Sequence, residues 1–200
     1  MMIKLGIDFD NTLIIYDALF KKAALEKNLI PLNFPECKNS IRDYLRERDQ
    51  EKLFTTLQGE IYGSRIFEAS PAKGMYETLK KAKNNGIELF IISHKTKTPY
   101  QGPKYNLHDA ASNWLEKNLF FEKTGINIPR ENVFFEVTKE KKIKRIESLG
   151  CTHFVDDLPE ILDMVNSKIK KILYNPKLNY LKKNDYINMT NWFEFSKIID

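Results

Sequence analysis

Five short apolar runs, each bounded by polar or turn-forming residues, constrain the fold of this 200-residue chain more than any other feature. Runs of this length, rich in branched and aromatic side chains, are typical of buried strands. They are Ile3–Phe9, Ile87–Ile92, Val133–Val137, Thr152–Val155 and Lys171–Tyr174. Helical spacing of apolar residues lies between several of them, at Pro71–Asn85, Lys139–Leu149 and Leu158–Val165. This alternation predicts an α/β fold, a doubly wound parallel sheet with helices on both faces.

Two stretches are too long to be simple connections in such a sheet. The first, residues 14–70, has helical patterns at Tyr16–Leu29, Ser40–Arg48 and Gln50–Ile61. We therefore expect an α/β core formed by residues 1–13 and 71–200, and a small helical insertion formed by residues 14–70. The second stretch, His94–Arg130, contains a helical pattern at Ala110–Asn118. The C-terminal segment Asn191–Ile199 also predicts a short helix.

Charge and hydropathy exclude several classes of function. The 32 basic and 27 acidic residues leave a net charge of +5, and the lysines are scattered. With neither a basic stripe nor a nucleic-acid-binding motif, we expect no nucleic-acid partner. No apolar run approaches the roughly 20 residues needed to cross a bilayer, and the N-terminus has no signal-peptide pattern. Two cysteines are too few for a disulfide framework. These features predict a cytoplasmic protein without membrane contact, and they carry no signal of oligomeric state.

Reactive side chains follow three of the predicted strands at their carboxyl ends. Asp8 and Asp10 come at the end of the first strand, Ser93 follows the second, and Asp156 and Asp157 follow the fourth. Because parallel strands present these ends at one edge of the sheet, the side chains should gather in one crevice. Four carboxylates in one place repel each other unless a cation is present, and oxygen ligands favour a hard ion such as Mg²⁺.

The run Asp8-Phe9-Asp10-Asn11-Thr12-Leu13 resembles the first motif of the haloacid-dehalogenase-like (HAD) hydrolase superfamily. Ser93 lies where the second motif places its hydroxyl, and Asp156-Asp157 resembles the acidic fourth motif. The resemblance covers nearly the whole predicted core outside the insertions. Asn11 stands where the family often has glycine, and asparagine also tolerates turn conformations.

The third motif of the superfamily is one lysine near the start of the helix that precedes the acidic pair. Lys139, Lys141 and Lys142 all satisfy this description. We favour Lys142, because it directly precedes the first core-facing residue of that helix, Ile143, and Lys139 is the next candidate.

The resemblance implies a role for each motif residue. Asp8 would be the nucleophile that forms an aspartyl-phosphate, and Asp10 would protonate the leaving oxygen and then activate water. Mg²⁺ would be held by Asp8, the carbonyl of Asp10, and Asp156 with Asp157. Phosphate oxygens would be held by Ser93, the Thr12 hydroxyl and Lys142. The candidate substrate-binding residues are Asn11, Thr12, His94 and Lys95.

Asp157 has an alternative, structural role. It could cap the next helix, with Glu160 three residues later completing a capping box.

Together these features predict a magnesium-dependent phosphatase that acts on a small phosphorylated metabolite. In this superfamily an insertion after the first motif forms a cap, so residues 14–70 are expected to supply substrate contacts, with Gln58, Tyr62 and Arg65 as candidates. The closing Asn191-Trp192 segment is somewhat similar to that of small deoxyribonucleotidases, which makes a 5'-nucleotidase an alternative. A phosphotransferase, or a phosphate-binding module without turnover, also stays open.

Overall fold

The computed structural model describes residues 2–178 and 185–199, which form two compact units. The first unit consists of Met1–Ile14, Pro71–Lys95 and Glu116–Asp200, and the second consists of Ile15–Ser70 and Thr96–Leu115. The chain passes between the units at a two-stranded sheet of β2 (Ile14–Ile15) and β3 (Ser70–Pro71), and again after β4.

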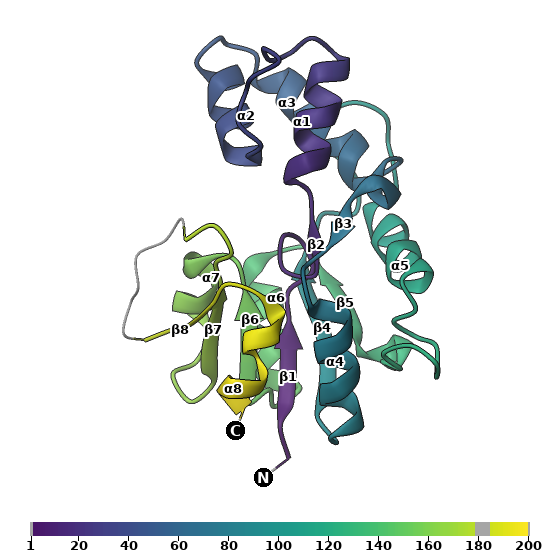
Figure 1. The fold of residues 1–200 in the computed structure, drawn as a ribbon, viewed down its shortest axis with the longest axis vertical. Helices are drawn as coiled ribbons and strands as arrows, with labels where there is room; N and C mark the ends of the chain where they lie inside the picture. The colour runs from purple at the N-terminus through teal and green to yellow at the C-terminus, as the bar shows by residue number, and fades with distance from the viewer. Residues whose placement is uncertain (1, 179–184, 200) are drawn as a thin grey trace. The chain divides into compact units, whose positions relative to one another are not determined.

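The first unit is built on a six-stranded sheet of order β5-β4-β1-β6-β7-β8, and every neighbouring pair is parallel (Figure 1). The strands are β1 (Lys4–Ile7), β4 (Glu88–His94), β5 (Val133–Glu136), β6 (His153–Asp156), β7 (Lys170–Tyr174) and β8 (Ile187–Met189). The predicted fold class is confirmed. The short strand β8 was not predicted, because a three-residue edge strand with a polar centre has no apolar run to mark it.

Helices cover both faces of this sheet (Figure 1). One face carries α6 (Lys139–Ser148) and α7 (Pro159–Met164), and the other carries α4 (Met75–Asn84) with the C-terminal elements η3 (Trp192–Glu194) and α8 (Ser196–Ile199). The face below α6 and α7 encloses a core of apolar side chains that includes Phe90, Ile92, Ile146, Phe154, Ile161, Leu162 and Leu173. Burial of these side chains is the main force that holds the strand ends together.

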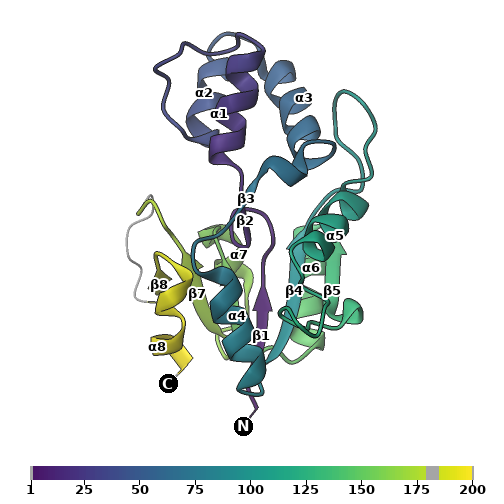
Figure 2. The same cartoon turned by 45° about the vertical axis from the view of Figure 1, so that its right-hand side comes forward.

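The second unit is helical (Figure 2). It contains α1 (Asp17–Glu26), α2 (Lys38–Arg46), α3 (Glu51–Tyr62) and η1 (Ile66–Glu68), and α1 and α2 both pack on α3. Phe20 of α1 stacks on Phe54 of α3, with ring centroids 5.6 Å apart. These helices agree with the helical patterns of the sequence to within a few residues.

The second unit also contains a segment far along the chain, Thr96–Leu115, which the sequence did not group with residues 14–70. This segment packs on Gly59 in α3 and on Gly63, the C-cap residue of that helix. A Cβ atom on Gly59 would lie 2.8 Å from Cβ of Pro99, and one on Gly63 would lie 2.5 Å from Cγ of Tyr105. Such distances are closer than non-bonded carbon atoms approach, so the packing requires glycine at both positions. Helix α5 (Leu107–Lys117) follows, and its last two residues are grouped with the first unit, as is η2 (Arg130–Asn132).

Within residues 2–178 and 185–199, no helix combines the length and the apolar character that a membrane span requires.

Candidate active site

Asp8 stands immediately after the last residue of β1, at the carboxyl end of the sheet. Its backbone N–H donates to the carbonyl of Val155 in β6 at 2.9 Å, which extends the parallel ladder by one residue. The chain then turns sharply: the N–H groups of Leu13 and Ile14 both donate to the carbonyl of Phe9, and Asn11 has φ 58°. This left-handed conformation is strained for most L-residues but accessible to asparagine, which accounts for Asn11 where the family often has glycine.

Two distant segments anchor the turn that follows Asp8. The indole Nε1–H of Trp192, which is fully buried, donates to the carbonyl of Thr12 at 3.0 Å. The N–H of Ala72 donates to the carbonyl of Leu13 at 2.8 Å. No local pattern predicts the contact between Trp192 and Thr12, because the two residues are 180 positions apart.

Lys142 links the ends of two strands. Its Nζ atom lies 2.6 Å from Oδ1 of Asp8 and 2.6 Å from Oδ2 of Asp156, and all three side chains are buried. Helix α6 starts at the N-cap Thr138, whose hydroxyl accepts from the N–H of Lys141, so Lys142 lies in the turn nearest the strand ends.

The two other candidate lysines point elsewhere. Lys139 pairs with Glu160 at 2.9 Å, and Lys141 is exposed. Of the three lysines considered, only Lys142 reaches the carboxylates.

Burial and neighbouring charge shift both partners of this contact. Burial raises the pKa of Asp8 to about 7; the charges of Asp156 and Asp10 also raise it, and Lys142 opposes them. Burial by itself would lower the pKa of Lys142, but the carboxylates of Asp156 and Asp8 outweigh it and raise that pKa above its ordinary value. A carboxyl group with a pKa near 7 is only partly ionised at neutral pH, so a further cation would strengthen it as a nucleophile.

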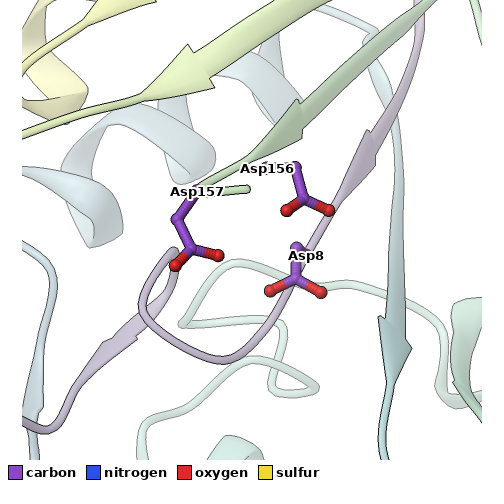
Figure 3. Close-up of side chains that lie close together, drawn as sticks. All are labelled: Asp8, Asp156 and Asp157. Atoms are coloured by element: carbon purple, nitrogen blue, oxygen red, sulfur yellow. The ribbon is translucent and has the colours of Figure 1, made fainter. Parts of the chain in front are cut away.

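Three carboxylates meet at the ends of β1 and β6 (Figure 3). Ligand oxygens of Asp8, Asp156 and Asp157 all lie within 4.8 Å of one another. This set fits a divalent cation, because all the donors are hard carboxylate oxygens. The carboxylate of Asp10 is not among the three.

Asp157 is not the N-cap residue of the following helix. Helix α7 has Leu158 as its N-cap residue, with Pro159 next, and the Leu158 side chain makes no capping hydrogen bond. The N–H of Leu158 instead donates to Oδ1 of Asp156 at 2.9 Å. Proline at the first helical position shifts the start of the helix by one residue, so that Asp157 lies outside it.

Asp10 contacts Lys95 rather than the acidic cluster. Nζ of Lys95 lies 2.8 Å from each carboxylate oxygen of Asp10, and the lysine is 3% exposed. The sequence suggests Lys95 as a substrate-binding residue but does not predict its ion pair with Asp10.

Two predicted phosphate ligands are buried hydroxyls that lack hydrogen-bond partners. Within the described residues, neither Oγ1 of Thr12 nor Oγ of Ser93 has a partner, although both side chains are buried. Leaving a buried hydroxyl unpaired costs on the order of 1–3 kcal/mol, so such groups commonly serve a ligand. Their chemistry fits the oxygens of a phosphate group.

His94 is the last residue of β4. Side chains alternate along a strand, so His94 and Ser93 face opposite sides of the sheet. His94 is half-buried, and burial lowers its pKa. Of the two candidate substrate-binding residues His94 and Lys95, Lys95 is the one that forms an ion pair with Asp10.

Arg65, a candidate substrate contact, is engaged within the second unit. Its guanidinium lies 2.6 Å from Glu26 and 2.7 Å from Glu68. Similarly, Nζ of Lys38 donates to the hydroxyl of Tyr62 at 2.7 Å.

Solved structures with a similar fold include HAD hydrolases. A HAD-superfamily hydrolase from Ehrlichia chaffeensis matches 100% of this chain and 97% of its own, with a TM-score of 0.56 and 14% identity. A "putative HAD-hydrolase" from Bacillus subtilis, bound to magnesium, matches 100% and 99%, with a TM-score of 0.58 and 12% identity. The protein has the fold of the HAD-like hydrolases, and the resemblance seen in its sequence is confirmed.

Curated relatives in sequence extend over the full chain. A "putative nucleotidase" of Bacillus cereus is 26% identical over 98% of this chain and 97% of its own. A second "putative nucleotidase", from Oceanobacillus iheyensis, is 23% identical over 97% of both chains. No family model matches the sequence.

Proposed function

We propose that this protein is a magnesium-dependent phosphatase that hydrolyses a small phosphate monoester through an aspartyl-phosphate on Asp8. One observation carries the proposal: the buried Asp8 lies at a strand end, 2.6 Å from the ammonium of Lys142 and within 4.8 Å of the other carboxylates of an acidic cluster. The proposed nucleophile, a counter-charge and the candidate metal ligands thus lie close together. The HAD-like fold and the nucleotidase relatives support a phosphatase or nucleotidase activity.

In the first step, a carboxylate oxygen of Asp8 attacks phosphorus, and the bond from phosphorus to the ester oxygen breaks. Asp10 gives a proton to the departing oxygen, which leaves as an alcohol. In the second step, Asp10 takes a proton from a water molecule that attacks the phosphorus of the aspartyl-phosphate. This step restores Asp8 and releases inorganic phosphate.

The remaining residues position the phosphate group. The Lys142 ammonium and the unpaired hydroxyls of Thr12 and Ser93 would hold its oxygens. Mg²⁺, held by Asp8, the carbonyl of Asp10, Asp156 and Asp157, would neutralise charge on the phosphate and favour the ionised form of Asp8. The helical unit formed around residues 15–70 would act as the cap that selects the substrate.

Nucleoside monophosphates are the first substrates to test, because both full-length relatives are named nucleotidases. The purified protein would be incubated with Mg²⁺ and a panel of nucleoside monophosphates, sugar phosphates and small phosphorylated acids. We expect phosphate release that EDTA abolishes and that Asp8→Asn lacks.

Asp49→Asn is a matched control, since Asp49 is exposed and its left-handed backbone suits asparagine. Asp8-dependent labelling of an added acceptor without phosphate release would instead indicate a phosphotransferase. The absence of any Asp8-dependent reaction across the panel would refute the proposal.

A further inference from the structure

A second buried lysine, Lys95, lies on the proton-transferring residue rather than on the nucleophile. Its ammonium is 2.8 Å from both carboxylate oxygens of Asp10 and 5.4 Å from the ring centroid of Phe9. Its backbone N–H donates to the carbonyl of Glu136 at 2.8 Å, which fixes the residue to the neighbouring strand β5. Main chain and side chain are therefore both held.

Lys142 and Lys95, the two lysines buried among the described residues, contact different carboxylates. Lys142 contacts Asp8 and Asp156, whereas Lys95 contacts Asp10. Lysine is seldom fully buried without a partner, because its charge must be compensated. Lys95 is thus in place to hold one particular carboxylate, and the Asp10 side chain, 17% exposed, is the more accessible of the two partners.

A carboxylate that contacts one ammonium through both oxygens loses freedom to rotate about its terminal torsion. Such restriction matters for proton transfer, which requires the donor oxygen to lie within hydrogen-bond reach of the departing oxygen. An unrestrained Asp10 would sample orientations that cannot transfer a proton.

We propose that Lys95 is a positioning residue that acts through Asp10, by holding its carboxylate in the orientation required for proton transfer. This inference rests on the proposed function, in which Asp10 serves as acid and base. It assigns to Lys95 a role different from direct contact with the substrate phosphate.

The test uses substrates that differ in their need for a proton. Release of an alkyl alcohol requires protonation, whereas a nitrophenolate leaves without it. Leaving-group release in a single turnover would be measured for wild type and Lys95→Met with an alkyl phosphate and with p-nitrophenyl phosphate. We expect a loss of about 10–100-fold for the alkyl phosphate. For the nitrophenyl ester, we expect a change within about twofold.

A double variant tests whether Lys95 acts through Asp10. Lys95→Met in an Asp10→Asn background should change nitrophenolate release by no more than about twofold relative to Asp10→Asn alone. The double variant removes both charges of the ion pair, so it stays informative if Lys95→Met alone folds poorly. Lys141→Met is the matched control, because Lys141 is exposed on α6.

Two outcomes would overturn the inference. An equal fall in the rate of leaving-group release for both substrates, with weaker inhibition by inorganic phosphate, would mean that Lys95 binds the substrate phosphate directly. Loss of thermal stability without any dependence on the leaving group would mean a structural role alone. If the wild type shows no Asp8-dependent turnover, the proposed function fails before this comparison is made, so the two failures are distinguishable.

Discussion

Lys142 and Asp8 are 134 residues apart in the chain, yet the ammonium of one lies 2.6 Å from the carboxylate of the other. The contact joins the first turn of α6 to the end of β1, and both side chains are almost fully buried. The contact places a positive charge beside the proposed nucleophile, in surroundings that solvent hardly reaches.

Removal of the buried ammonium should affect both activity and stability. Lys142→Met leaves the Asp8 and Asp156 carboxylates without their shared counter-charge. We expect a fall in kcat of about 100-fold or more, as for loss of an electrostatic donor. We also expect a loss of about 3–5 kcal/mol in unfolding free energy, as for a broken buried ion pair. Steady-state kinetics and chemical denaturation in EDTA would measure the two effects, with Lys141→Met as control. Unchanged activity would contradict the role of Lys142.

The stability of the metal-free protein should depend on the ionisation of Asp8. Burial raises the pKa of Asp8 from 3.8 to about 7, so the folded state binds the proton more tightly than the unfolded state. The resulting stabilisation is fully present below about pH 4 and is lost as the pH rises through about 7. Its size is on the order of a few kcal/mol, because one pKa unit corresponds to about 1.4 kcal/mol.

The Asp8→Asn variant has no ionisable group at position 8. Comparison with this variant therefore isolates the part of the pH-dependent stability that comes from Asp8. Denaturation in EDTA between about pH 4 and pH 8 should show wild type losing stability relative to Asp8→Asn. Parallel pH profiles for the two proteins would show that Asp8 is ionised throughout.

A divalent cation should stabilise the folded protein through the acidic cluster. Mg²⁺ at about 100 times its dissociation constant adds roughly 2.7 kcal/mol if it binds only the folded state. Thermal unfolding should shift upward with Mg²⁺ in wild type and much less in Asp157→Asn, which removes one carboxylate of the cluster. Glu140→Gln is a suitable control, since Glu140 is exposed on α6. An equal shift in Asp157→Asn would place the cation elsewhere.

Removal of the buried Thr12 or Ser93 hydroxyl should lower activity without lowering the stability of the free protein. Thr12→Val replaces a buried, unpartnered hydroxyl with a methyl group of similar size. We expect the free protein to be unchanged or more stable by about 1 kcal/mol, because a desolvated polar group is removed. Turnover should fall about tenfold or more if the hydroxyl holds phosphate.

Ser93→Ala tests the same reasoning at the end of β4. Thermal unfolding and phosphatase kinetics, measured on the same preparations, would compare the two effects. Loss of stability in both variants would mean that the hydroxyls have structural partners in the folded protein.

Glycine at position 63 should be essential for the packing of the segment after β4. Gly63→Val would place side-chain atoms where Tyr105 lies, since even a Cβ atom would be 2.5 Å from its Cγ. Overpacking of this kind typically lowers the free energy of unfolding by about 1–3 kcal/mol. Detachment of residues 96–105 from Gly63 would relieve the clash. Limited proteolysis should therefore cut Gly63→Val within residues 96–105 faster than it cuts the wild type. Lys52→Ala is the control, because Lys52 is exposed on α3, the helix that ends before Gly63.

The sequence by itself determined the sheet and the identity of the strand-end residues. Buried strands must be apolar, and parallel strands must present their carboxyl ends together, so local patterns alone predicted β1, β4, β5, β6 and β7. The left-handed turn at Asn11 also follows from local chemistry. The edge strand β8 escaped prediction, because its pairing partners, and not its own side chains, make it a strand.

Only the tertiary structure decided which charged groups are partners. Three lysines near the start of α6 satisfy the sequence pattern, and the contacts with Asp8 and Asp156 select Lys142. Three contacts depend on distance in space and not on spacing in sequence: Lys95 on Asp10, Trp192 on Thr12, and the 96–105 segment on Gly59 and Gly63. The physical reason is that hydrophobic periodicity specifies which face of an element is buried, whereas an ion pair or a close backbone approach requires the position of the second partner.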